Sequence, residues 1–124
     1  MLQVQGAGEA SRDIDVADST SACRFVEALV AVAMGVSIAD LRRPSRGSAP
    51  VAFARQAAMY LAHVQFGLTL EQAGRHFGRD RTTAAHACRR IEDKRDDARF
   101  ERVVVCLEAA IQWWQRNAGT GGQQ

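Results

Sequence analysis

The sequence predicts a small all-α domain. Apolar residues recur three and four positions apart in several segments, which is the spacing of one face of an α-helix. No segment shows the strict alternation of apolar and polar residues that is typical of a half-buried strand. With 124 residues, of which 47% are hydrophobic, the chain can build one domain with a modest core. We place this domain at residues 20–117, between flexible tails at residues 1–19 and 118–124.

The first helix is predicted from about residue 20 to Met34, where Gly35 ends it. Residues 1–19 are rich in Gly, Asp, Ala and Ser and lack periodicity, so we expect a tail there. The buried face of the helix is predicted to consist of Phe25, Ala28, Leu29 and Val32, with Val26 and Val30 widening the apolar area.

A short helix and a long helix follow. Ser37, with Asp40 three residues later, predicts the start of the short helix SIADLRR. Residues 44–50, PSRGSAP, form a loop, and Pro50 fits the first turn of the long helix because its missing N–H costs nothing there. The long helix runs to about Phe66 and stops at Gly67. Its main apolar stripe is predicted to be Phe53, Ala57, Leu61 and Val64.

Two further helices are predicted on either side of a tight turn. Thr69 and Gln72 form a capping-box start for a helix that ends at Phe77, and Gly78 is its left-handed stop. Asp80 is placed to cap the next helix through the backbone N–H groups near Thr82 and Thr83. The core face of this second helix is predicted to be Ala84, Ala87, Cys88 and Ile91.

A final helix is predicted from about Arg99 to Arg116. One stripe should pack on the domain: Phe100, Val103, Val104, Leu107, Ile111 and Trp114. A second apolar side carries Cys106, Ala110 and Trp113. Either the first helix covers this side through Phe25 and Leu29, or it is a partner surface for a homodimer, the transcription machinery or a regulator protein.

The positive charge is concentrated on one part of the chain. The formal net charge is only +2, but residues 37–95 carry eleven Arg or Lys against five Asp or Glu. Both flanking stretches are acidic: residues 1–36 carry two basic residues against five acidic ones, and residues 96–124 carry three against four. This distribution predicts a surface that binds a polyanion.

The start of the second helix carries a cluster of groups suited to nucleic acid: Arg79, Asp80, Arg81, Thr82 and Thr83. Helix, turn and helix in this layout are typical of a DNA reader whose second helix enters the major groove. Asp can accept from cytosine N4, Arg can bind guanine O6 and N7, and the Thr methyl can pack on that of thymine. The alternative is that these residues only form a well-capped helix start.

The motif GRDRTTAAHACRRI resembles the C-terminal duplex-DNA-binding domain of DnaA, whose signature reads G-G-R-D-H-T-T-V-x-H-A. The resemblance covers about residues 29–95. It implies a helix-turn-helix domain, here with an extra C-terminal helix, that binds double-stranded DNA. It implies base contacts at Asp80, Arg81 and Thr82, a phosphate contact at Thr83 and a backbone contact at His86. This chain departs from the signature at Arg81, which replaces a His, and at the turn, which has one glycine fewer.

Further DNA contacts are expected around this helix. Arg89 and Arg90 lie on its outer face, where phosphate contact and a merely solvated face are equal alternatives. The family segment V-A-R-P-R-Q reads VAFARQ here, so Arg55 matches while Phe53 replaces an Arg. Arg42, Arg43 and Arg46, before and in the preceding loop, are candidates for a minor-groove or phosphate contact, and the favoured alternative for each alone is a solvated surface charge. We expect Phe53, the first residue of its stripe, to be at least partly buried; the alternative is an apolar wedge that unstacks a base step in the minor groove.

Nothing in the sequence predicts an enzyme, a metal site or a cofactor. Cys23, Cys88 and Cys106 match neither a disulfide framework nor a zinc site, and His63 and His76 lack ligand spacing. There is no G-x-x-x-x-G-K-[ST] motif, so we expect a stand-alone DNA-binding protein without an ATPase module. No apolar run approaches the length of a membrane span, and no signal peptide is predicted. We therefore expect a cytoplasmic protein that is associated with the nucleoid.

The function predicted from these observations is sequence-specific binding of double-stranded DNA by a transcriptional regulator. Two alternatives stay open: a regulator of replication initiation that competes at DnaA-type sites, and a protein-interaction module that has lost DNA binding. The sequence leaves open the operator, the target genes and the sign of regulation.

Overall fold

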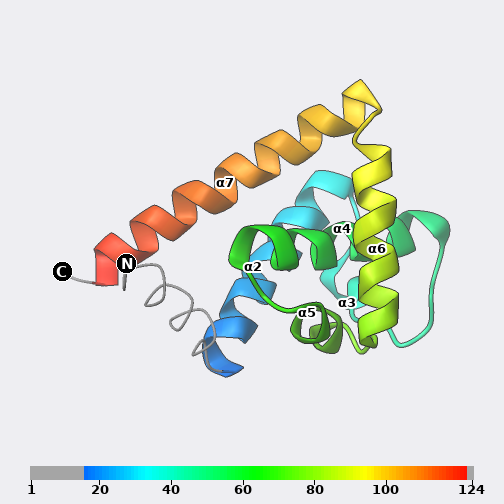
Figure 1. The fold of residues 1–124 in the computed structure, drawn as a ribbon, viewed down its shortest axis with the longest axis horizontal. Coiled ribbons are helices and arrows are strands. Elements are labelled where there is room, and N and C mark those ends of the chain that lie inside the picture. The colour runs from blue at the N-terminus through cyan, green and yellow to red at the C-terminus, as the bar shows by residue number, and fades with distance from the viewer. Residues whose placement is uncertain (1–15, 123–124) are drawn as a thin grey trace, which may run out of the picture.

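A computed structural model of the chain describes residues 16–122, and within this range the chain forms six helices and no strand. The helices are α2 (Val16–Met34), α3 (Ile38–Leu41), α4 (Ala49–Phe66), α5 (Leu70–His76), α6 (Arg81–Lys94) and α7 (Ala98–Gly122). Figure 1 shows α2 to α6 gathered into one body and α7 crossing it as a long diagonal helix. The predicted all-α class is confirmed.

The two outer helices are longer than predicted. Helix α2 begins at Val16 rather than near residue 20. The earlier start was not predicted because the residues before position 20 lack apolar periodicity. Helix α7 continues to Gly122, beyond the end predicted at Arg116, although glycines disfavour a helix interior. The predicted tails otherwise fall on residues 1–15 and 123–124, which lie outside the described part of the chain.

The helix ends follow the capping signals in the sequence. The Gln72 backbone N–H donates to Thr69 Oγ1 at 3.0 Å, and the Thr69 N–H donates to Gln72 Oε1 at 2.9 Å. Each of these two hydrogen bonds thus satisfies a backbone N–H group that has no partner within the helix. Ser37 Oγ accepts from the Asp40 N–H at 3.0 Å at the start of α3. The predicted starts of α3 and α5 are therefore confirmed.

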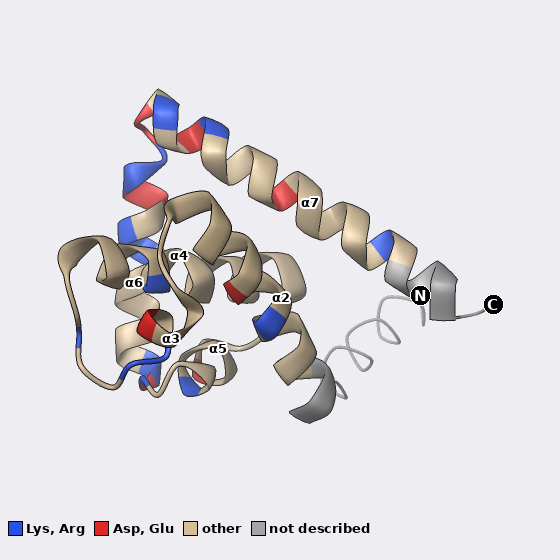
Figure 2. Cartoon of the chain, turned by 180° about the vertical axis from the view of Figure 1, so that it is seen from behind, with Lys and Arg blue, Asp and Glu red and all other residues tan. Residues whose placement is uncertain are grey.

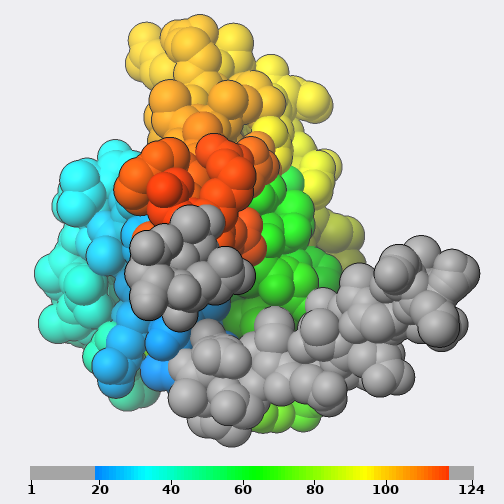
Figure 3. Space-filling model, turned by 90° about the vertical axis from the view of Figure 1, so that its left-hand side faces the viewer, coloured from blue at the N-terminus to red at the C-terminus, as the bar shows by residue number. Residues whose placement is uncertain are grey.

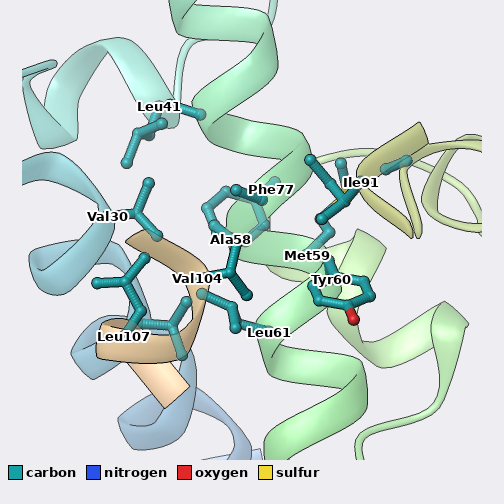
Figure 4. Packing of buried hydrophobic residues seen from close by; sticks show 14 of the residues in the cluster. Val30, Leu41, Ala58, Met59, Tyr60, Leu61, Phe77, Ile91, Val104 and Leu107 are labelled. Carbon is teal, nitrogen blue, oxygen red and sulfur yellow. The ribbon is translucent and has the colours of Figure 1, made fainter. Parts of the chain in front are cut away.

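Helix α4 is the centre of the domain, and the other helices pack around it (Figure 4). Every side chain from Ala57 to Ala62 is buried. The core residues that meet α4 come from α2, α3, α6, α7 and the position directly after α5: Val30, Leu41, Ile91, Val104, Leu107 and Phe77. The predicted stripe of α4 fails in its last turn, where Val64 is 45% exposed, while Phe66 of the same turn packs against Trp114 of α7.

The buried face of α2 differs from the predicted one. Its buried residues at helical spacing are Cys23, Val26, Glu27 and Val30, whereas Val32 is 85% exposed. Glu27 is fully buried because Arg42 binds both of its carboxylate oxygens, at 2.7 and 2.8 Å. A prediction based on apolar spacing cannot assign a glutamate to the core. It therefore placed the buried face on the side of α2 that carries Val32 instead of the side that carries Glu27.

Helix α7 packs by the predicted stripe. Val104, Leu107 and Ile111 are buried, and the Trp114 ring stacks on Phe25 at 4.5 Å between centroids. The expectation that α2 covers the second side is wrong, because Trp113 is 58% exposed. Figure 3 shows the later part of α7, in orange and red, next to α2, in blue. No helix in residues 16–122 has the length and apolar character needed to cross a membrane.

Candidate nucleic-acid interface

A close contact between backbones sets the angle between α5 and α6. Gly74 is buried on α5, and a Cβ built on it would lie 2.7 Å from the carbonyl oxygen of Arg79 and 3.0 Å from that of Asp80. The Arg79 N–H donates to the Gly74 carbonyl at 2.9 Å. Gly78, with φ of 70°, turns the chain between them. The glycines thus allow the tight turn that carries the start of α6.

Asp80 caps α6, as predicted. Its side chain accepts from the Thr83 backbone N–H at 2.9 Å, and this hydrogen bond holds the pKa of Asp80 below its ordinary value. The carboxylate is exposed, so it stays ionised and can accept a further hydrogen bond. The cap-only interpretation and base recognition are therefore compatible at this residue.

One face of α6 is open to solvent along its whole length. The exposed residues are Arg81, Thr82, Thr83, His86, Arg89 and Arg90, while Ala84, Ala87 and Ile91 are buried on the other side. This is the division predicted, with Cys88 half-buried at its edge. Figure 2 shows Lys and Arg gathered along α6 and the loop beside it. The arrangement presents cations to one side of the helix without an apolar cover.

Two of the predicted DNA-contacting arginines are engaged inside the protein. Arg55 is 3% exposed, and its guanidinium donates to the carbonyl oxygens of Leu41, Arg46 and Asp40 at 2.8, 3.0 and 2.9 Å. Burial, and then the nearby Arg79 and Arg46, lower its pKa. A buried side chain with these partners cannot reach DNA, so direct contact by Arg55 is corrected to a role in holding the loop between α3 and α4.

Arg79 has a similar position. Its guanidinium donates to the carbonyl oxygens of Phe77, Arg43 and Ser45 at 2.7, 2.9 and 3.0 Å. Arg79 thus ties the turn before α6 to the loop at residues 42–48. The half-buried side chain helps to position the helix start, and its contact with DNA stays a prediction.

The loop arginines differ in how far they are engaged. Arg43 forms an ion pair with Asp40 at 2.8 Å, whereas Arg46 is exposed and lines a small groove of about 270 Å³ with Arg55, Arg79 and Thr83. Arg43 and Arg46 therefore add positive charge beside the start of α6.

A groove between α4 and α6 brings Gln56 and Asp93, which were not predicted to belong to the site, beside residues that were. It has a volume of about 670 Å³ and is lined by Phe53, Gln56, His86, Arg89, Arg90, Asp93 and Lys94. The guanidinium carbon of Arg90 lies 5.7 Å from the Phe53 ring centroid, a cation–π distance. Phe53 also packs on Phe100 at 5.1 Å, which confirms that it is partly buried. Gln56 was signalled only by its match to the family segment.

The described residues contain no group of three His, Cys, Asp or Glu side chains placed to hold a metal ion. His63 Nδ1 lies 2.6 Å from the Leu68 carbonyl oxygen, and His76 Nε2 lies 3.1 Å from Glu27 Oε2. Both histidines are therefore packed against neighbours.

The chain is similar to known proteins over the same helices. The family described as the bacterial dnaA protein helix-turn-helix matches residues 24–91. A chromosomal replication initiator protein DnaA of Protochlamydia amoebophila is 40% identical over 65 residues, which cover 52% of this chain and 14% of that protein. The corresponding protein of Symbiobacterium thermophilum is 36% identical over 88 residues, covering 69% and 19%.

A longer similarity is found with the chromosomal replication initiator protein DnaA of Burkholderia multivorans. It is 32% identical over 113 residues, covering 89% of this chain and 21% of that protein. An alignment of this length must enter α7, so the similarity continues past residue 95, where the resemblance was expected to fade. The chain spans at most about a fifth of the length of these relatives. The family match covers more than half of the chain and includes the capped turn and α6 described above, and the chain therefore belongs to the bacterial DnaA helix-turn-helix family.

Proposed function

We propose that this protein binds double-stranded DNA sequence-specifically through the start of α6 and acts as a transcriptional regulator. The observation that carries the proposal is the exposed, cationic face of α6, which begins with Arg81 and Thr82 directly after the Asp80 cap. A helix of this kind presents its first residues to base edges in the major groove.

The roles of the exposed residues follow from their chemistry. Arg81 is suited to guanine O6 and N7, and the Thr82 methyl to the methyl group of thymine. His86, Arg89 and Arg90 lie further along the same face, where contact with phosphates fixes the register of the protein on the duplex. Arg46, exposed beside the start of α6, supplies a contact to the flanking strand.

A second candidate function is control of replication initiation by competition at DnaA-type sites. It is favoured by the relatives, which are chromosomal replication initiator proteins. It is opposed by Arg81, which stands where the signature has His and so changes the base-reading surface. A module that has lost DNA binding is disfavoured because the cationic face of α6 is open.

The proposed setting follows from this role. A regulator of transcription acts in the cytoplasm on the nucleoid, and it affects transcription through contact with the transcription machinery, with a regulator protein or with a second copy of itself.

The test is selection of bound sites from a library of random duplexes, followed by titrations of the selected site at several salt concentrations. We expect one enriched motif and a slope of log K against log salt of about −0.9 for each neutralised phosphate. Mapping the motif onto promoters or onto the replication origin separates the two functions. No enrichment, with affinity that barely changes with salt, would contradict DNA recognition.

A further inference from the structure

A second surface lies on α2 and α7. Ala33 of α2 and Val103, Cys106 and Leu107 of α7 line an open, mainly apolar groove of about 370 Å³, which we call the α2–α7 groove. Arg99 and Arg102 of α7 line it too. Figure 3 shows the side of the molecule on which α7 lies against α2. The exposed side chains of the DNA-binding candidates come instead from α6 and residues 42–48, so the two surfaces use different elements.

The apolar side of α7 continues beyond this groove. Trp113 follows Cys106 by seven residues, or about two turns, and so lies on the same side of the helix. Its neighbour Trp114 stacks on Phe25 and makes an edge contact with Phe66, whereas Trp113 is 58% exposed. Val105, the residue before Cys106, is 48% exposed. Large exposed apolar side chains in one region are typical of an interaction site.

The charge beside the groove is positive. The two acidic residues within α7, Glu101 and Glu108, both bind Arg95, with closest distances of 2.6 and 3.0 Å, and the charged residues that line the groove are arginines. Asp97 accepts from the backbone N–H groups of Arg99 and Phe100 and caps the helix. Arg102 forms no ion pair with any acidic residue of the described chain.

These charges argue against a second copy as the occupant. A symmetric dimer places the same patch of both subunits together, so that each residue of the patch faces its own region in the partner. In a dimer whose twofold axis passes through the α2–α7 groove, Arg99 and Arg102 of the two copies would approach one another in a desolvated contact. Juxtaposed like charges are unfavourable, whereas an acidic partner is attracted.

We propose that the α2–α7 groove binds an acidic amphipathic helix of a partner protein. Apolar side chains of that helix, at i, i+3, i+4 and i+7, occupy the groove and extend toward Trp113. Its flanking Asp or Glu side chains pair with Arg99 and Arg102. Because the exposed face of α6 is not part of this contact, the protein can hold the partner and DNA at the same time.

The experiment uses a stapled helical peptide with Leu at the four apolar positions and Glu on both flanks, and a control peptide with Lys in place of Glu. Binding to the full chain is followed by fluorescence anisotropy and by the NMR signal of the Trp113 indole N–H. We expect the Glu peptide to bind at least about tenfold more tightly than the Lys peptide. Trp113→Ala is expected to weaken the Glu peptide without unfolding the domain, whereas Trp114→Ala removes a core ring and lowers stability.

Charge reversal gives the sharper test. Arg102→Glu is expected to reverse the preference, so that the Lys peptide binds more tightly than the Glu peptide. Arg24→Glu is the matched control: it makes the same charge change at an exposed position of α2, nine residues and so about half a turn out of phase from Ala33, and it should leave the preference unchanged.

Several outcomes would overturn the proposal. They are no binding of the Glu peptide, equal binding of both peptides, or an unchanged preference in Arg102→Glu. Concentration-dependent dimerisation through Trp113, seen by sedimentation, would assign the groove to a second copy. Binding to phosphatidylglycerol vesicles but not to the peptide would assign it to a lipid surface. DNA affinity is measured in every variant, and its absence would contradict the proposed function without affecting the peptide result.

Discussion

Arg81 and Arg90 are both exposed on α6, but they lie at different distances from its start. Arg81 is the first residue of the helix, next to the capping Asp80. Arg90 lies about two and a half turns later, with its guanidinium over the Phe53 ring. The first residues of a recognition helix contact bases, and the flanking positions contact phosphates. Removing each arginine should therefore have a different consequence.

Arg81→Ala is expected to relax base preference and to weaken binding at the selected site by on the order of 1–3 kcal/mol. Arg90→Ala is expected to weaken all duplexes about equally and to reduce the salt slope by about one. Site selection with each variant, together with titrations of one fixed duplex, measures both effects. An Arg81→Ala protein that selects the wild-type motif would remove Arg81 from base reading.

The element that positions these residues is the α5–turn–α6 unit, and its geometry depends on Gly74. At this helical position alanine would usually be preferred, because glycine lowers helix propensity. Here an added Cβ meets two backbone carbonyl oxygens, at 2.7 and 3.0 Å, and neither can move without moving the start of α6. The steric term therefore outweighs the propensity term.

Gly74→Ala is expected to lower stability by about 1–3 kcal/mol, as overpacking does, and also to weaken DNA binding by displacing the start of α6. Gly35→Ala is the control, because Gly35 has φ of 67° but nothing within 4 Å of an added Cβ. It should cost about 1–2 kcal/mol of backbone strain with DNA affinity unchanged. Thermal unfolding and DNA titration give both quantities, and native affinity in Gly74→Ala would contradict the positioning role.

Across the whole molecule, one buried carboxylate joins three helices. Glu27 of α2 is bound by Arg42, directly after α3, and lies 3.1 Å from His76 Nε2 of α5. Burial by itself would raise the pKa of Glu27, but the hydrogen bond from Arg42 and the neighbouring His76 outweigh it, so the pKa lies below its ordinary value. The carboxylate is therefore ionised in the folded protein at neutral pH.

This pKa shift predicts a pH dependence of stability. Because the folded-state pKa is lowered, the stabilisation is fully present above the ordinary carboxyl pKa and is lost as the pH falls through the folded-state value. Glu27→Gln should reduce the loss of stability between about pH 5 and pH 3. Urea unfolding of both proteins across this range is the measurement. Parallel curves for the two proteins would show that other carboxyl groups cause the acid limb.

Arg42→Met tests the same cluster by a different route. It leaves Glu27 buried with His76 alone and should cost on the order of 1–3 kcal/mol at neutral pH. The value should stay below that for a fully buried pair, because the Arg42 side chain is 47% exposed.

Local signals in the sequence were enough to predict several helix ends and the exposed face of α6. Caps at Ser37, Thr69 and Asp80, the stop at Gly78 and the apolar spacing of α6 all depend on residues within one or two turns of each other. Such interactions are the same in any tertiary context. The class of the fold, the capped turn and the exposed face of α6 could therefore be predicted from the sequence.

Only the tertiary structure decided which residues are buried and which are exposed where the partners of those residues are distant in the chain. Arg55 and Arg46 are the same residue type, yet Arg55 is buried against carbonyl groups up to 15 residues away and Arg46 is exposed. Glu27 belongs to the core because Arg42 arrives from another helix. Trp113 and Trp114 are adjacent, and only the packing of Phe25 determines which of them is covered. Whether a charged group or an aromatic ring is buried depends on a partner that folding brings from a distant part of the chain. Hydrophobicity and local spacing cannot predict that partner.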